Sequence, residues 1–296
     1  MWTIGVDLGG TNLRVGVINE AGQIVIEKSC STNAEKGPNY VLNQMIQFIE
    51  EVKKGMDIHA IGIGSPGPLN PFEGIILEPP NLPGWRNIPL VERVKKATNL
   101  PVVLDNDANA AALAEATVGA GKDVNSVFYI TVSTGIGGGY VLNKKIVQGA
   151  QGNCGEIGNM IVDPAGEGAP GLNKGALEAL ASGTAIGREG ARLLGIKGGA
   201  KEVFQLAYEG NETAKQIIDR AVHYLAIGIA NIVHTVNPEM IILGGGVMKS
   251  GDVILEPLKD KVKDFVYPSL RDSIQIKRAA LDQKAGLIGA GLLAQK

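Results

Sequence analysis

The chain has 296 residues, of which 45% are hydrophobic and 20% are charged, and its formal net charge is −2. This length suits either two domains or one large domain, and the composition is ordinary for a globular protein. Because basic residues are not in excess, the composition argues against nucleic acid as the main partner.

The first half of the chain predicts a mixture of strands and helices. Apolar runs bounded by tight turns predict strands, and apolar residues at helical spacing predict amphipathic helices. In chain order we expect strands at 2–7, 13–19 and 24–30, a helix at 38–54, a strand at 58–64, a helix at 89–98, a strand at 102–104 and an alanine-rich helix at 107–118.

The second half opens with the same order of strand, glycine turn and strand that opens the first. We expect strands at 126–132, 140–142 and 146–148, helices over most of 175–236 with a break near 195–199, a strand at 240–243, a helix at 253–266, a strand at 274–279 and a final helix from residue 285. Strands that alternate with helices indicate an α/β architecture.

Nothing in the sequence predicts a secreted or membrane protein. The two cysteines, Cys30 and Cys154, lie far apart and form no CxxC pair, which is typical of a reducing compartment. A strand-like run begins at Trp2, so we expect no signal peptide. The most apolar long stretch, 222–236, contains two histidines and an asparagine, and it is too short and too polar to span a bilayer. These features predict a soluble, cytoplasmic protein.

The first glycine-rich turn, Asp7 to Thr11, directly follows an apolar strand. Gly9 and Gly10 would let a phosphate approach the backbone N–H groups, because no Cβ stands in the way. Thr11 adds a hydroxyl donor, and Asp7 is suited to hold a magnesium ion directly or through water. A plain glycine hairpin is the alternative, and the Walker pattern GxxxxGK[ST] is absent from the sequence.

The second glycine-rich turn, residues 131–139, also follows a strand. Its spacing resembles GxGxxG, but the segment from Tyr140 predicts a strand and not a helix, so a dinucleotide-binding Rossmann turn is excluded. Two turns of phosphate size, one in each half, suit a triphosphate held between two lobes. A third turn at 244–247 is suited to approach a purine or ribose, and a tight strand-to-helix connection explains it equally well.

A carboxylate, Asp107, stands at the start of the alanine-rich helix, next to Asn106. Asn and Asp are preferred helix caps worth about 1 kcal/mol, and a cap alone would explain this pair. However, ligands of α/β proteins bind at the carboxyl ends of strands. Asn106 is therefore also a candidate to bind one hydroxyl of a ligand, and Asp107 a candidate general base for another.

The remaining acidic and histidine side chains are weaker candidates for chemistry. Glu156 and Glu178 are possible acceptors, although each alone is more often a surface or capping carboxylate. His59, His223 and His234 are the only histidines, and two of them lie on an apolar helix. They are typical of structural histidines, so a Ser/His/Asp mechanism has little support.

Taken together, these segments resemble the ROK family (repressors, open reading frames and sugar kinases), in particular its bacterial glucokinases. The resemblance extends over nearly the whole chain. The motifs that carry it are DLGGT at 7–11 with Gly16, GSPGP at 64–68, NLPGW at 81–85, NDAN at 106–109, TGIGGG at 134–139, GEIG at 155–158, LE at 177–178 with ASG at 181–183, NPE at 237–239 and GGG at 244–246.

The resemblance implies a two-lobed actin-like, ribonuclease-H-like duplicated fold with a cleft between the lobes. Residues 1–117 with 284–296 would form the sugar- and phosphate-binding lobe, and residues 118–283 the lobe for nucleotide binding and dimerisation. The chain is then expected to be an ATP-dependent hexose kinase that acts on O6 of glucose, and to form a homodimer.

The resemblance also assigns residues to the two substrates. Asp107 would be the catalytic base, and Asp7 would hold the magnesium ion that accompanies ATP. The sugar would be bound by Gly67, Asn81, Asn106, Asp107, Glu156, Asn159 and Glu178. ATP would be bound by Asp7, Gly9, Gly10, Thr11, Thr134, Gly135, Gly137, Gly245 and Gly246.

The sequence departs from the family pattern at one metal site. Family members usually hold a structural zinc ion with one histidine and three cysteines, and the four aligned positions here are Asn159, Ala169, Gly171 and Ala176. We therefore predict no zinc. The segment 163–174 must then be held by other contacts or stay mobile. Because the family histidine also touches the sugar, Asn159 leaves the identity of the sugar open, although an amide can both donate and accept.

Alternatives remain open for the acceptor, the donor and the function. The alternative acceptors are mannose, fructose, an N-acetylated hexosamine and a β-glucoside. The alternative phosphoryl donor is polyphosphate, as in some relatives. A sugar-responsive repressor would need a helix-turn-helix domain before Trp2, where the sequence leaves no room. A non-catalytic sugar-binding or regulatory protein is the remaining alternative, and the presence of Asp7 and Asp107 argues against it.

Overall fold

The computed structural model of the protein describes residues 1–250 and 252–295, which form two compact units. The first unit consists of Met1–Asn125, Gly139–Cys154 and the residues from Ala280 onward, and the second of Ser126–Gly138 and Gly155–Ala279. Each unit contains strands and helices, in agreement with the predicted α/β class.

The first unit is built on a five-stranded mixed sheet in the order β3-β2-β1-β4-β7. Its strands are β1 (Trp2–Leu8), β2 (Asn12–Ile18), β3 (Ile24–Ser31), β4 (Ile58–Ser65) and β7 (Val102–Asn106). The first three strands are antiparallel, and β4 and β7 continue the sheet parallel to β1. All five predicted strands are confirmed, and β7 is longer than predicted because it includes Asp105 and Asn106.

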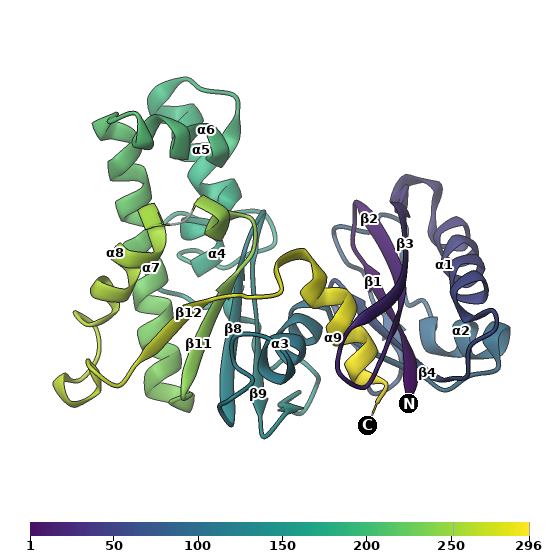
Figure 1. Ribbon diagram of the computed structural model, residues 1–296. Coiled ribbons are helices and arrows are strands. Elements are labelled where there is room, and N and C mark those ends of the chain that lie inside the picture. Colours follow the sequence, from purple (N-terminus) through teal and green to yellow (C-terminus); the bar gives the residue numbers. More distant parts are fainter. Residues whose placement is uncertain (251, 296) are drawn as a thin grey trace. The chain divides into compact units, whose positions relative to one another are not determined.

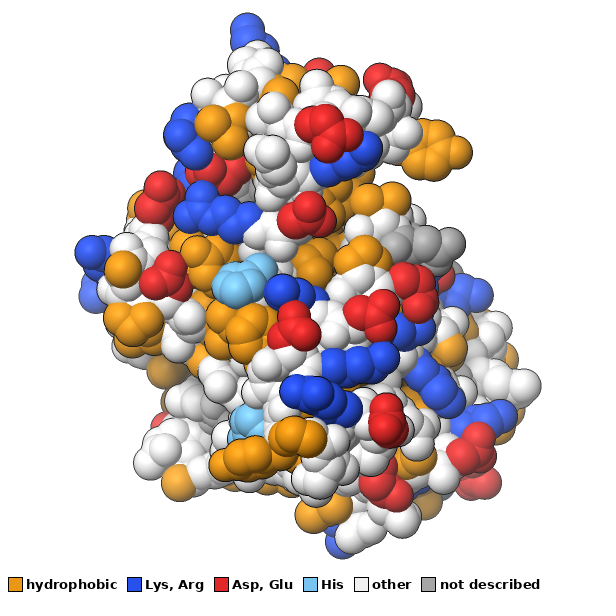
Figure 2. Space-filling view, turned by 90° about the vertical axis from the view of Figure 1, so that its left-hand side faces the viewer, with side chains coloured by type: hydrophobic (Ala, Val, Ile, Leu, Met, Phe, Trp, Pro, Cys, Tyr) orange, Lys and Arg blue, Asp and Glu red, His pale blue; other side chains and the backbone are white. Residues whose placement is uncertain are grey.

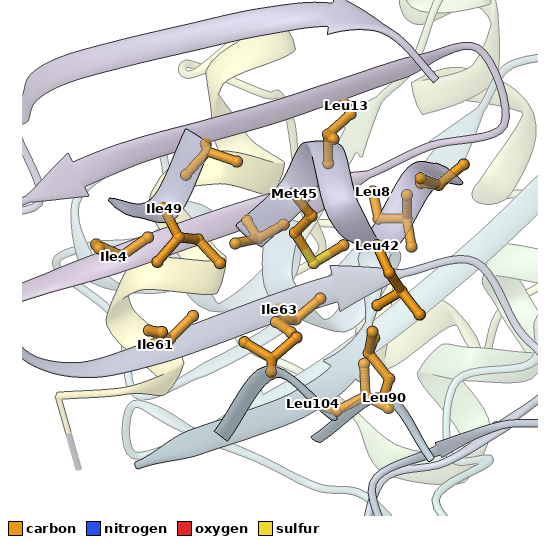
Figure 3. Close-up of a cluster of buried hydrophobic side chains, with 14 of the residues drawn as sticks. Ile4, Leu8, Leu13, Leu42, Met45, Ile49, Ile61, Ile63, Leu90 and Leu104 are labelled. Carbon is orange, nitrogen blue, oxygen red and sulfur yellow. The ribbon is translucent and has the colours of Figure 1, made fainter. Parts of the chain in front are cut away.

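One face of this sheet is covered by α1 (Pro38–Lys53) and α2 (Leu90–Thr98) (Figure 1). The apolar positions of α1 recur at helical spacing, so they form one buried stripe. Figure 3 shows this stripe packed against side chains from β1 and β4, with these residues labelled: Leu42, Met45, Ile49, Ile4, Leu8, Ile61 and Ile63. Each fully buried side chain of this size contributes about 1.5–3 kcal/mol to stability.

The opposite face is covered by α9 (Ala285–Leu293), which in turn packs against α3 (Asp107–Thr117) (Figure 1). These contacts require glycine. A Cβ added to Gly5 or Gly62 would lie 2.2 Å or 1.8 Å from a carbonyl oxygen of α9, and one added to Gly289 would lie 1.7 Å from the backbone of α3. The sheet, α9 and α3 are therefore packed backbone against backbone.

A buried carboxylate, Glu115, ties the segments that flank these helices. Its Oε2 accepts hydrogen bonds from the backbone N–H groups of Ala120 (2.9 Å) and Ala280 (3.1 Å), and its Oε1 accepts one from Leu281 (2.8 Å). A buried charge is costly unless it is hydrogen-bonded, and here three N–H donors meet that need.

The hairpin within 139–154 belongs to the first unit, whereas the sequence prediction assigned it to the second lobe. The amino group of Lys144 donates hydrogen bonds to the carbonyl oxygens of Ala116 (2.6 Å), Lys122 (2.7 Å) and Val124 (3.0 Å). These contacts attach the hairpin to the end of α3. The predicted lobe boundaries at 117/118 and 283/284 stay a prediction.

The second sheet has the order β10-β9-β8-β11-β12, and the division between the units falls inside β9. Its strands are β8 (Ser126–Val132), β9 (Ile136–Leu142), β10 (Lys145–Ile146), β11 (Met240–Gly244) and β12 (Gln275–Arg278). β11 runs parallel to both β8 and β12. β9 begins four residues before the predicted start, so part of the predicted glycine turn is strand.

The helices of the second unit follow the prediction for 175–236, including the break near 195–199. They are α4 (Leu177–Ala181), α5 (Gly183–Leu194), α6 (Gly199–Tyr208), α7 (Glu212–Val236) and α8 (Asp252–Val262). Asn211 caps α7 by accepting a hydrogen bond from Ala214 N at 3.0 Å, and Asn237 ends the helix in the left-handed conformation. α8 ends four residues before the predicted end.

The short elements complete the fold. They are a hairpin of β5 (Leu69–Asn70) and β6 (Ile75–Ile76), which the sequence analysis did not predict, and the 3₁₀ turns Ala34–Lys36, Ile157–Asn159, Val247–Ser250, Pro268–Leu270 and Asp282–Lys284. Within 1–250 and 252–295, no helix is both long and apolar enough to cross a membrane.

Figure 2 shows the face that carries α7 and α8, where hydrophobic side chains gather around histidine side chains. The ring of His223 packs edge-on against Tyr224 and Phe265, with ring centroids 5.5 Å and 5.3 Å away. His234 packs in the same way against Tyr267 at 5.0 Å. These ring contacts fit the prediction that the two histidines are structural, which stays a prediction.

Candidate active site

Two carboxylates, Asp7 and Asp107, lie at the carboxyl ends of β1 and β7. β4 separates these strands, and its Gly64 pairs with Asp7 on one side and with Asp105 on the other, so the three strand ends are level. A Cβ on Gly64 would lie 3.2 Å from Cβ of Ala110, a tight contact, and 3.7 Å from Cα of Asp107, so Gly64 packs against the first turn of α3. The strand order therefore brings together two residues that lie 100 positions apart in the sequence.

The electrostatics of the two carboxylates are coupled. The pKa of Asp7 is raised from 3.8 to about 6, mainly by burial and then by the negative charges of Asp107 and, more weakly, Glu27, whereas the Arg14 guanidinium opposes the rise. Burial also raises the pKa of Asp107, although the backbone N–H of Ala108 opposes this by donating a hydrogen bond. Two neighbouring carboxylates with raised pKa values are well suited to take up a proton or a cation.

The structure decides which side chain caps α3. Asn106 is the N-cap, and its Oδ1 accepts a hydrogen bond from Ala108 N at 2.8 Å. Asp107 Oδ1 accepts from the same N–H at 2.8 Å. Because Asn106 performs the capping, the cap alone does not explain Asp107, whose half-buried side chain is coupled to that of Asp7.

The first glycine turn is a hairpin between β1 and β2, closed by a hydrogen bond from Gly9 N to Asn12 O at 2.9 Å. A Cβ on Gly10 would lie 2.7 Å from the carbonyl oxygen of Asn81. The structure therefore brings together Gly10 and Asn81, which the resemblance assigned to ATP and to the sugar. Thr11 is exposed at the tip of the hairpin, and Gly67 follows β4 at a cis peptide bond to Pro68.

In the second unit, Glu178 supports the second glycine turn. Glu178 lies in the first turn of α4, and its Oε2 accepts a hydrogen bond from Ile136 N at 2.7 Å. A Cβ on Gly135 would lie 2.5 Å from that oxygen, and one on Gly158 would lie 3.2 Å from it. The carboxylate is thus packed between the turn at Gly135 and the GEIG segment. Glu156, from the same segment, is exposed just before the 3₁₀ turn Ile157–Asn159.

The segment beyond Asn159 is held by side-chain contacts. Asn159 Oδ1 accepts a hydrogen bond from Asn173 N at 2.7 Å, which closes the segment at its base. Tyr224 donates from its hydroxyl to Asp163 Oδ2 at 3.0 Å and so attaches the segment to α7. Among the described residues, 1–250 and 252–295, no group of three or more His, Cys, Asp or Glu side chains is arranged to hold a metal ion.

A cavity of about 750 Å³ opens in the second unit beside the second glycine turn. The start of α5 is tied to that turn, because Gly183 N donates to Ser133 O at 2.8 Å and Thr184 Oγ1 donates to Thr134 O at 2.8 Å. The lining residues are Ser133, Thr134, Gly183, Thr184, Gly187, Gly199, Ala200, Lys201, Phe204, Gly246, Val247, Lys249 and Ser250.

Among the residues of this unit that were predicted to bind ATP, Thr134 and Gly246 line the cavity. Gly245 has a φ of +92°, and a Cβ there would lie 2.3 Å from Val132 O. The backbone conformation and the close contact with β8 therefore require glycine at this position. The sequence analysis missed Lys201, Phe204 and Lys249. Only Lys249 had a signal, because it lies two residues after the third glycine turn.

Comparison with known proteins gives a consistent result. The sequence profile of the ROK family matches residues 3–296. A glucokinase of Thermotoga maritima is 38% identical over 301 residues, covering 97% of this chain and 95% of that protein. A glucokinase of Halalkalibacterium halodurans is 36% identical over 315 residues, covering 100% and 95%.

Two solved structures resemble the protein over its whole length. The ROK hexokinase from Thermus thermophilus is 35% identical with a TM-score of 0.89, and the match covers 100% of this chain and 98% of that one. A ROK family glucokinase from Streptomyces griseus, solved in complex with glucose and AMPPNP, is 32% identical with a TM-score of 0.83 and coverage of 100% and 99%. The predicted actin-like fold is confirmed.

Proposed function

The chain belongs to the ROK family, and from that premise we propose that it is an ATP-dependent hexose kinase that transfers the γ-phosphoryl group to O6 of glucose. The observation that carries the proposal is the corner at the ends of β1 and β7, where Asp107, with a raised pKa, stands beside Asp7. Two relatives named glucokinase, 38% and 36% identical, support glucose as the acceptor.

In the proposed reaction, the oxygen of the sugar hydroxyl forms a bond to the γ-phosphorus of ATP. The hydroxyl proton passes to the carboxylate of Asp107, and the bond between the γ-phosphorus and the bridging oxygen breaks, with its electron pair leaving on ADP. General-base help of this kind contributes about 10²- to 10⁴-fold to the rate. The raised pKa of Asp107 suits this task, because it brings the affinity of the base for a proton closer to neutral pH.

Asp7 is the proposed ligand for the magnesium ion that accompanies ATP. Mg²⁺ prefers oxygen ligands and is commonly bound by one or two carboxylates together with substrate phosphates. The half-buried carboxylate of Asp7, next to the turn at Gly9, Gly10 and Thr11, fits this pattern. When bound, the ion would supply positive charge at the phosphoryl group.

The cavity of the second unit is the proposed nucleoside site. Its volume of about 750 Å³ lies within the usual range of small-molecule pockets, roughly 300–1,000 Å³. Phe204 offers an apolar surface for a base, and Lys201 and Lys249 offer positive charge for phosphates or ribose oxygens. Thr134 and Gly246 bring the second and third glycine turns to the same cavity.

The proposed sugar ligands are Gly67, Asn81, Asn106, Asp107, Glu156, Asn159 and Glu178. For Asn106 and Asn159 the structure sharpens this proposal. The Oδ1 atom of each already accepts a backbone hydrogen bond, so each amide would present its Nδ2 group to the sugar as a donor. A homodimer and a cytoplasmic location are also proposed.

A coupled assay of ADP release over a panel of sugars tests the proposal. Glucose is expected to give the highest kcat/KM among glucose, mannose, fructose, N-acetylmannosamine and a β-glucoside, and phosphorus NMR should identify the product as the 6-phosphate. A higher kcat/KM for another sugar would reassign the acceptor within the same reaction. Sugar binding without turnover of any acceptor would favour the non-catalytic alternative and contradict the proposal.

A further inference from the structure

A second carboxylate, Asp105, lies buried beneath the corner that carries Asp107. Its side chain is 2% exposed, and it is the next-to-last residue of β7. The Oδ1 atom accepts hydrogen bonds from Asn106 N and from Asn109 Nδ2, each at 2.8 Å. The Oδ2 atom accepts one from Gln148 Nε2 at 2.8 Å. The carboxylate therefore bonds to three segments: the end of β7, the first turns of α3 and the loop after β10.

These bonds bracket Asp107 along the chain. Asn106 precedes Asp107 directly and caps α3, and Asn109 lies two residues after it on the same helix. Asp105 bonds to the backbone just before Asp107 and to a side chain two residues after it, and these bonds restrain the first turn of the helix. Gln148 adds a third anchor from the hairpin at 139–154, which Lys144 attaches to the end of α3.

The hydrogen bond from Asn109 to Asp105 leaves one buried polar atom of Asn109 unpaired in the described part of the chain, which is unfavourable for stability. Asn109 Oδ1 is buried and has no hydrogen-bond partner within the described residues. It faces Gly139, where an added Cβ would lie 2.9 Å away. Because the carboxylate of Asp105 only accepts, Asn109 must turn its Nδ2 toward Asp105 and leave its oxygen unpaired. Unpaired buried acceptors and similar local violations are typical of functional sites.

We infer that Asp105 is a positioning residue, which holds Asp107 in the orientation needed to accept the hydroxyl proton. The inference rests on the proposed role of Asp107 as the base. Asp105 acts through Asn106, Asn109 and Gln148 and has no role in contacting the sugar or ATP itself.

Asp105→Ala tests the inference, because it removes the acceptor from all three donors at once. We expect kcat to fall by about 10- to 100-fold, the loss that follows from small misplacement of a catalytic group. The KM for ATP should change less than about twofold, because the proposed nucleoside cavity is lined by other residues. Gln148→Ala, which removes one anchor from a half-buried position, should lower kcat by a smaller factor and retain the fold.

Asp105→Asn provides the rescue. The N–H of Asn106 keeps the remaining side-chain oxygen at the Oδ1 position, so the new amide nitrogen faces Gln148, which can turn its own amide to accept. We expect this variant to retain kcat within about fivefold. In Asp105→Asn/Gln148→Ala that partner is missing, and kcat should fall to the level of Gln148→Ala or below.

A matched control separates positioning from stability. Ile49→Ala, in the fully buried stripe of α1, should lower the unfolding midpoint as Asp105→Ala does but leave kcat unchanged. The inference is overturned if Asp105→Ala keeps kcat within twofold of wild type, or if Ile49→Ala at equal stability loses as much kcat. Activity of Asp107→Asn decides separately whether the proposed base is correct. If that variant is inactive and Asp105→Ala is not, only the inference about Asp105 fails.

Discussion

Each unit pairs a glycine turn with carboxylates, but the two pairs use their carboxylates differently. In the first unit, Asp7 and Asp107 lie near the hairpin at Gly9 and Gly10, and each keeps a raised pKa. In the second unit, one oxygen of Glu178 accepts a hydrogen bond from the backbone N–H of Ile136, which stabilises the glycine turn. We propose the carboxylates of the first unit for the chemistry itself, whereas that of the second unit also shapes a loop. An acidic residue beside a glycine turn is therefore not a catalytic residue by position alone.

Neutralising one carboxylate in each unit gives the largest expected difference. Asp107→Asn should lower kcat by about 10²- to 10⁴-fold, because the amide cannot accept the hydroxyl proton. Glu178→Gln keeps a side-chain oxygen for Ile136 N, so kcat should fall by less than about tenfold. Steady-state kinetics at saturating ATP and sugar measure both. Equal losses in the two variants would remove the distinction between the two carboxylates.

The raised pKa of Asp7 predicts how stability depends on pH. An unfolded chain has an ordinary pKa near 3.8 at this residue and the folded protein has one of about 6, so between these values the folded state binds the extra proton. Relative to its value at high pH, the free energy of unfolding is therefore increased by this residue below pH 3.8. This increase is lost as the pH rises through 6. The shift corresponds to roughly 3 kcal/mol.

Asp7→Asn removes this contribution, so it provides the measurement. Urea unfolding at intervals from pH 4 to pH 8 should show the variant gaining stability relative to wild type as the pH rises. Carboxylates remote from Asp7 affect both proteins equally and cancel in the difference, whereas Asp107, which is coupled to Asp7, also contributes to it. A difference that stays constant over the whole range would mean that Asp7 titrates normally.

Adding a methyl group to each turn gives the smallest expected effect. Gly10→Ala places a Cβ 2.7 Å from the backbone oxygen of Asn81, whereas Gly135→Ala places one 2.5 Å from the side-chain carboxylate of Glu178. Overpacking typically costs about 1–3 kcal/mol, and a side chain moves aside more easily than a backbone. Gly10→Ala should therefore destabilise the protein more than Gly135→Ala does in urea unfolding.

Gly246→Ala is the matched control for these two variants. A Cβ at Gly246 would meet only Ser133 Oγ at 3.7 Å, which is an ordinary contact. Its unfolding midpoint should stay at the wild-type value. A larger loss for Gly135→Ala than for Gly10→Ala would indicate that the hydrogen bond from Ile136 to Glu178 matters more than the overlap with backbone.

The sequence predicted the long apolar elements well and the glycine-rich ones poorly. Strands such as β1 and β8 are continuous apolar runs, so their existence follows from composition alone. β9 was predicted to start at Tyr140 because glycines usually indicate a loop. A Cβ on Gly139 would lie 2.8 Å from Ala112 of α3, so this strand needs glycine for close packing. That requirement depends on a helix elsewhere in the sequence.

The same limit applies to the site. Asp7 and Asp107 were predicted because each follows a strand, and a strand end is a local signal. The role of Asp105 depends on Gln148, 43 residues further on, and that contact exists only after the hairpin has packed on the first unit. Lys201 and Phe204 line the cavity from α6 without any motif. Contacts made between distant segments left no pattern that the sequence analysis used.

The close packing of α9 has a consequence for folding during synthesis on the ribosome. The sheet surface at Gly5 and Gly62 is shaped to fit the backbone of a helix that is made about 170 residues after α3. At about 5–20 residues per second, the nascent chain waits roughly ten to thirty seconds for that helix. During this time the sheet surface at Gly5 and Gly62 is not covered by α9, and a chain that stops before Ala285 lacks the helix whose Gly286 packs against Asp7.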